Sequence, residues 1–176
     1  MSHLGRLGPL IALAVACGPA SEEPSIHVSG PCLANVTWAP MPDQVQETSG
    51  LAVSRAHPGV LWTHNDSQGD SALFAIDSTG SLIGRVRVAG ATNRDWEDIA
   101  VGPCEPDAST SCIFIGDIGD NSERRDAIVV YRIPEPDPRI DTISAAADRL
   151  EAAYPDHPRD AEALYVTRAG IHIVTK

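Results

Sequence analysis

A segment that occurs three times constrains this chain more than any other feature. Each copy opens with a carboxylate and runs into a short apolar strand, and the copies cover residues 47–54, 95–102 and 160–167. A turn and a second apolar strand follow each copy. The spacing suits a four-stranded propeller blade, with an insertion in the second blade, better than a short solenoid repeat.

The stretches around the copies read as short strands separated by Gly-bearing turns, as antiparallel meanders require. We predict four strands in the first repeat (51–54, 60–63, 72–77, 82–88), four in the second (98–101, 112–116, 127–133, 149–154) and two in the third, the last of them at 171–175. Residues 145–153 are ambiguous, because the same apolar run is compatible with a short helix.

These strands predict an all-β fold, and specifically a β-propeller over residues 47–176 with about two and a half four-stranded antiparallel blades. Propellers have four to eight blades and close to remove their open edges. The sequence is therefore expected to be an N-terminal fragment of a longer protein. A β-sandwich of about ten strands is the alternative, which explains the length but not the triple repeat.

The N-terminus predicts export. Arg6 precedes an uncharged apolar stretch, residues 7–16, that is too short to span a bilayer and is typical of a signal peptide. Small residues lead up to Cys17, as at a lipidation site, so we expect a signal peptide over 1–17 and a flexible tether over 18–46. The chain would be a membrane-anchored lipoprotein of a bacterial cell envelope. Ordinary cleavage would make it secreted.

The net charge limits the classes of possible partner, and the cysteines predict one disulfide. The chain has 24 acidic and 13 basic residues, a net charge of -11, which argues against nucleic acid as a partner and against membrane contact other than through a lipid anchor. Cys104 and Cys112 bracket a polar loop between two predicted strands, so a disulfide should close that hairpin in an oxidising compartment. Cys32 has no evident partner.

The opening acids of the three copies are the first candidate site. First strands line the channel of a propeller, so Glu47, Asp95 and Asp160 should converge there. Residues two apart share a strand face, which adds Glu97 and Glu162, with Asp117 at the rim. Clustered carboxylates need a cation or raised pKa values, and oxygen ligands favour Ca²⁺ over Zn²⁺. Alternatively, each acid caps its own strand turn.

The loops after the second strands are the other candidate site, for substrate binding. It comprises His64, Asp66, Asn121 and Lys176. Asp-Gly-Asn loops such as 117–121 are more often plain turns than binding sites, and a structural role for His64 is favoured by its neighbour Trp62. Alternation directs Trp96 away from the acids on either side of it, into the packing between blades.

These segments resemble a group of exported bacterial six-bladed propeller proteins, mostly uncharacterised. The resemblance covers about residues 46–176 and is carried by Ser49-Gly-Leu-Ala52, Leu61-Trp-Thr-His-Asn-Asp66, Asn93-Arg-Asp-Trp-Glu-Asp-Ile-Ala100, Gly116-Asp-Ile-Gly-Asp-Asn121 and Asp160-Ala-Glu-Ala-Leu164. More distantly, residues 160–166 with Thr175 and Lys176 are similar to the repeat of calcium-dependent β-propeller phytases. That similarity implies acidic residues that hold calcium and a lysine that binds phosphate, although the doubled carboxylate of the phytase motif is interrupted here.

The sequence therefore predicts a cell-surface binding module with an acidic, calcium-binding channel mouth, whose partner is an extracellular protein. The alternative is a calcium-dependent phosphohydrolase acting on a phosphorylated small molecule, with Lys176 steadying the phosphate. No nucleophile elbow, P-loop or dinucleotide motif is present in the sequence.

Overall fold

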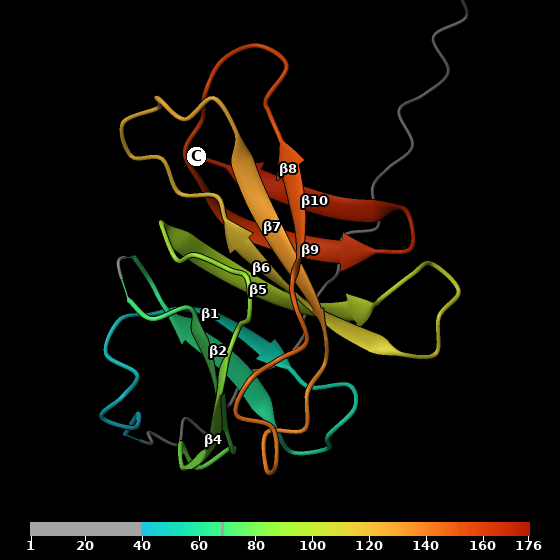
Figure 1. The fold of residues 1–176 in the computed structure, drawn as a ribbon. Coiled ribbons are helices and arrows are strands. Elements are labelled where there is room, and N and C mark those ends of the chain that lie inside the picture. The colour runs from blue at the N-terminus through green and yellow to red at the C-terminus, as the bar shows by residue number, and fades with distance from the viewer. Residues whose placement is uncertain (1–39, 68) are drawn as a thin grey trace, which may run out of the picture. The chain divides into compact units, whose positions relative to one another are not determined.

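The computed structural model describes residues 40–67 and 69–176, and this part of the chain contains strands and no helix (Figure 1). The strands are β1 (Thr48–Val53), β2 (Leu61–Asn65), β3 (Ala72–Ile76), β4 (Leu82–Arg87), β5 (Trp96–Pro103), β6 (Ser111–Asp117), β7 (Ile128–Pro134), β8 (Asp148–Ala152), β9 (Ala161–Thr167) and β10 (Gly170–Thr175). All ten lie where the sequence predicts a strand.

The strands form three antiparallel sheets in chain order, β1-β2-β3-β4, β5-β6-β7-β8 and β9-β10. The predicted all-β class is therefore confirmed, with three sheets in the described part of the chain rather than the two of a β-sandwich. A helix over 145–153 is wrong, because Asp148–Ala152 pairs with β7 along its whole length. An isolated helix of this length would be only marginally stable, whereas pairing with a neighbouring strand satisfies the backbone hydrogen-bonding groups.

The sequence repeat is also a repeat of backbone geometry. Each copy supplies the first strand of its sheet, and the pairing of that strand with the second shifts at the same point, just after the opening acid. Leu51, Ile99 and Leu164 therefore occupy equivalent positions in their sheets. The first strands β1, β5 and β9 are also spatial neighbours. At Gly50 a side chain would collide with the backbone of Ile99, so glycine is needed where β1 meets β5.

Two apolar layers hold the sheets together. The larger one buries Trp62, Leu73 and Val86 of the first sheet against Trp96 and Ile113 of the second. The smaller one buries side chains of the second sheet, including Phe114 and Val130, against Leu164 of the third. Each large apolar side chain contributes about 1.5–3 kcal/mol on full burial. Trp96 is completely buried between two sheets, which confirms its predicted packing role.

The proline-rich insertion of the second repeat covers the edge of the first sheet. Ile143 forms a parallel bridge with Arg87 at the end of β4, and the amide of Ala147 donates to the carbonyl of Ala89. Gly84 lies so close to the carbonyl of Pro138 that no larger residue fits there. An edge strand covered in this way cannot pair with another molecule.

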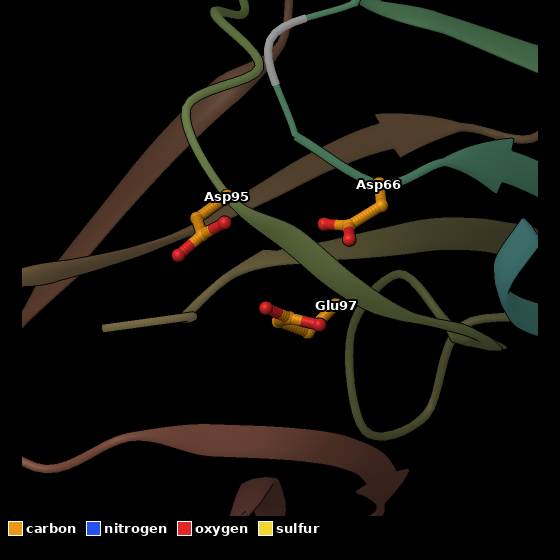
Figure 2. Close-up of side chains that lie close together, drawn as sticks. All are labelled: Asp66, Asp95 and Glu97. Carbon is orange, nitrogen blue, oxygen red and sulfur yellow. The ribbon is translucent and has the colours of Figure 1, made fainter. Parts of the chain in front are cut away.

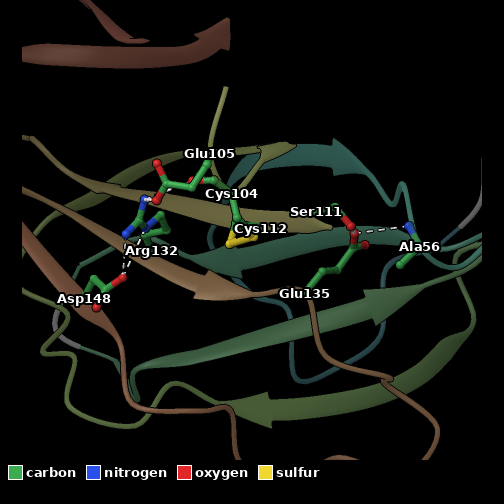
Figure 3. Close-up of a disulfide and its surroundings, with 8 residues drawn as sticks. All are labelled: Ala56, Cys104, Glu105, Ser111, Cys112, Arg132, Glu135 and Asp148. Carbon is green, nitrogen blue, oxygen red and sulfur yellow. Dashed lines mark hydrogen bonds and ion pairs between the residues drawn. A yellow bond between two sulfur atoms is a disulfide. The ribbon is translucent and has the colours of Figure 1, made fainter. Parts of the chain in front are cut away.

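The predicted disulfide is present between Cys104 and Cys112, whose Cα atoms lie 4.8 Å apart (Figure 3). Close by, the carboxylate of Glu135 joins the first two sheets. It accepts hydrogen bonds from Ser54 and Ser111 hydroxyls, the Trp62 indole and the Ala56 amide. Burial alone would raise the pKa of Glu135, but these hydrogen bonds offset burial and hold that pKa below its usual range.

The signal peptide, Cys17, Cys32 and most of the expected tether lie outside the described residues. Residues 40–46, the end of that tether, make defined contacts. The Asn65 side chain donates to the Gln44 carbonyl and accepts from the Gln46 amide, and Val45 is buried. No described segment forms a helix with the length and apolar character needed to cross a bilayer.

Candidate metal centre

Three carboxylates converge at the junction of the first two sheets. Asp66 directly follows β2, Asp95 directly precedes β5, and Glu97 is the second residue of β5. One oxygen from each lies within 4.8 Å of the others, and the three side chains point toward one another (Figure 2). The structure thus joins two predicted metal ligands, Asp95 and Glu97, with a residue predicted for substrate binding.

The backbone around Asp66 is held from two sides. Its amide donates to the carbonyl of Glu47 at 2.8 Å. The side-chain amide of Asn93 donates to the carbonyls of Asn65 and Asp66, and the Asn93 oxygen accepts from the Trp96 amide. Buried Asn93 therefore ties the Asp66 loop to the start of β5. Asn93 lies only two residues before Asp95, and this proximity in the sequence could have indicated that Asn93 belongs to the site.

Gly119 closes another side of the cluster. Its amide donates to the Asp95 carbonyl at 3.2 Å, and a Cβ atom at this position would overlap the carboxylates of Asp95 and Glu97. Arg125 fixes this loop, because its Nη1 donates to the Gly119 carbonyl and to Asp117 Oδ1, both at 2.8 Å. Arg125 and Asp117 are both buried. Sequence reasoning missed Arg125, although two arginines in so acidic a region were a visible signal.

The cluster carries excess negative charge. Burial raises the pKa of Asp95, and the charge of Asp66 raises it further. Burial, together with the charges of Glu162, Asp66 and Asp95, raises the pKa of Glu97 from 4.5 to about 8. Oδ1 of Asp66 is buried and has no hydrogen-bond partner among the described residues. A cation would supply that missing partner and offset the repulsion. The residues therefore fit a hard divalent ion bound through oxygen.

The other predicted ligands have different partners. Glu47 is exposed and joins the site only through its carbonyl. Lys176 Nζ lies 2.8 Å from Asp160 Oδ2 and also contacts Glu162. Burial would raise the pKa of Asp160, but the Asp120 amide and Lys176 lower it.

Asp117 belongs to the buried pair with Arg125. Asp98 accepts from the amides of Ile99 and Leu164. Asp98 and Asp160 thus each accept a backbone amide from a distant segment, Leu164 for Asp98 and Asp120 for Asp160.

The predicted substrate-binding residues have different surroundings. His64 is fully buried, with its ring 5.6 Å from that of Trp96 and its Nδ1 3.0 Å from the Asn65 carbonyl. Burial lowers its pKa, which agrees with a structural role. Asn121 is exposed and lines a cavity of about 690 Å³ together with Arg94, Asp95 and Gly119. Lys176 forms ion pairs with Asp160 and Glu162.

Comparison with known proteins adds no relative. No protein-family model, curated protein or solved structure matches this chain. The geometry of the site is therefore the basis for assigning a function.

Proposed function

We propose that this chain is an exported β-propeller binding module that holds one divalent cation, Ca²⁺, between Asp66, Asp95 and Glu97. The observation that carries the proposal is the carboxylate cluster itself, in which the buried Asp66 oxygen lacks a partner among the described residues. In this proposal the cation fixes the junction of two blades and so shapes the surface offered to an extracellular protein.

The propeller assignment is supported by the repeated first strands. They belong to successive meander sheets, share one shift in register, and are neighbours in space. Successive blades place their first strands together around a central axis. In this arrangement the opening acids lie at one end of the first strands, at one mouth of the channel.

The choice of Ca²⁺ rests on the ligands. Three carboxylates from two sheets provide up to six oxygen donors and neither sulfur nor imidazole, a set that suits Ca²⁺ better than Zn²⁺. Export is supported by the apolar stretch at 7–16 and by the disulfide, because disulfides persist in oxidising compartments. Anchoring through a lipid on Cys17 is part of the same proposal.

We do not extend the proposal to the phosphohydrolase alternative. Its phosphate-binding lysine would be Lys176, whose ammonium group is held by Asp160 and Glu162. A phosphatase assay with calcium, using a phosphate monoester, tests that alternative directly.

The cation site is tested by thermal unfolding and isothermal titration of the 176-residue chain with calcium or with chelator. At a calcium concentration about a hundred times Kd, stabilisation should be about 2.7 kcal/mol. Asp95→Asn should remove it, whereas the control Asp43→Asn, at an exposed carboxylate outside the cluster, should keep it. No response in the unmodified chain, or an unchanged response in Asp95→Asn, contradicts the proposed site.

A further inference from the structure

The opposite end of the first strands carries a basic counterpart to the acid cluster. The position eight residues after each opening acid (47 to 55, 95 to 103, 160 to 168) holds Arg55, Pro103 and Arg168. All three residues line one cavity of about 290 Å³. Two exposed arginines from different sheets thus face one hollow in a chain whose net charge is -11.

Acidic side chains lie near these arginines but do not pair with them. Neither forms an ion pair with a residue that the structure describes. Of the nearby acids, Glu105 pairs with Arg132, and the oxygens of Glu135 are occupied by four neutral donors although its negative charge remains. Asp107 also lines the cavity and provides one opposing charge. The charged side chains that line the hollow therefore leave one positive charge in excess.

An apolar hollow adjoins this cavity. Its volume is about 180 Å³, and it shares Pro103, Val166 and Arg168 with the basic cavity. Phe114, Leu150 and Ile171 complete much of its apolar lining. The disulfide and the bonds from Arg132 to Cys104 and Asp148 hold the hairpin that forms one wall (Figure 3). The wall is therefore preformed.

We propose that Arg55 and Arg168 form an oxyanion-binding site, for a ligand that carries a carboxylate or phosphate group beside a compact apolar group. A guanidinium group presents two N–H donors in the geometry that such oxyanions accept. An anion between the two arginines also relieves their mutual repulsion. The apolar group of the ligand occupies the neighbouring hollow. This site lies at the other end of the strands from the cation site and is independent of it.

The test is an NMR titration of the ¹⁵N-labelled chain at constant ionic strength, in chelator, following the arginine Nε–H signals and the amides of residues 166–170. The probes are acetate, phenylacetate, inorganic phosphate and the neutral analogue phenylacetamide. Phenylacetate should shift these signals saturably and bind more tightly than acetate. Phosphate reports whether a tetrahedral oxyanion is also accepted. Phenylacetamide should bind at least about tenfold more weakly than phenylacetate, because it lacks the charge-assisted bonds.

The variants are Arg55→Gln with Arg168→Gln, Arg55→Lys with Arg168→Lys, and the control Arg139→Gln, an exposed arginine in the insertion. The double glutamine variant should weaken phenylacetate binding by about tenfold or more. The double lysine variant should retain part of it, and the control all of it. Equal binding of phenylacetate and phenylacetamide, or unchanged binding in the double glutamine variant, overturns the proposal. Because both arginines are exposed, each variant should keep the dispersed spectrum of the folded chain.

Discussion

Two acid pairs at equivalent positions of the repeat have opposite neighbours. Asp95 and Glu97 begin the second sheet, and Asp160 and Glu162 begin the third. The first pair meets the carboxylate of Asp66, which reaches over from the preceding sheet. The second pair meets the ammonium of Lys176, which comes from its own sheet. The first pair therefore faces a third negative charge, whereas the second pair is partly neutralised by a lysine of the chain itself.

The residues that make this difference stand at the same place in their sheets. Asp66 and Lys176 each directly follow a second strand, and each donates its amide to the carbonyl of the opening acid, Glu47 or Asp160. The two residues thus share a backbone position but face different acids, because Lys176 contacts the pair of its own sheet and Asp66 contacts the pair of the next sheet. The comparison teaches that in a repeated scaffold the charge beside an acid pair depends both on the residue that follows the second strand and on the sheet toward which its side chain turns.

The largest expected effect concerns the loop that supports the first pair. Arg125→Met should destabilise the fold by about 3–5 kcal/mol, because it leaves the buried Asp117 carboxylate without its partner. Chemical denaturation measures this change. Arg124→Met is the matched control, since Arg124 is exposed and adjacent. A similar loss in both variants would mean that the buried pair is not the cause.

The next prediction replaces the third carboxylate beside the first pair with an ammonium group. Asp66→Lys should abolish stabilisation by calcium, a loss of about 2.7 kcal/mol at a hundredfold excess over Kd. In chelator the same variant should be at least as stable as the unmodified chain, because a positive charge replaces one of three crowded negative ones. Calcium-dependent unfolding that persists in Asp66→Lys would show that Asp66 is not a ligand.

The strands and the core followed from patterns along the chain, whereas the membership of the acid cluster did not. Alternation and the repeat located all ten strands and directed Trp96 to the packing between sheets. Alternation grouped Asp95 with Glu97, but it carries no information on which loop of a neighbouring sheet reaches the pair. The sequence therefore indicated Glu47 where the structure has Asp66. The partnership of Arg125 with Asp117 likewise depends on a loop folding back on itself.

A smaller effect is expected on the pH dependence of stability, through Glu97 of the first pair. Since the folded-state pKa of Glu97 is raised from 4.5 to about 8, the neutral acid is the form favoured by folding. Without cation, its contribution is complete below about pH 4.5 and is lost as the pH rises toward 8. Glu97→Gln should remove about 1–2 kcal/mol of this decline, less than the full shift implies because solvent screens part of the repulsion. Denaturation in chelator at pH 5 and pH 8.5 measures it, and parallel profiles for both proteins would contradict the assignment.

The smallest effect is expected at the second pair. The Lys176 side chain is 54% exposed, so its bonds to Asp160 and Glu162 are screened by water. Exposed ion pairs of this kind contribute about 0–1 kcal/mol, and Lys176→Gln should lower stability by no more than that. The number of calcium ions bound by Lys176→Gln is the sharper measurement. Titration should still give one calcium per chain, because the oxygens of Asp160 also accept the Asp120 amide and Glu162 is exposed. A second bound calcium in Lys176→Gln would show that the lysine is itself a substitute for a metal ion, and that both acid pairs are cation sites differing only in which cation they hold.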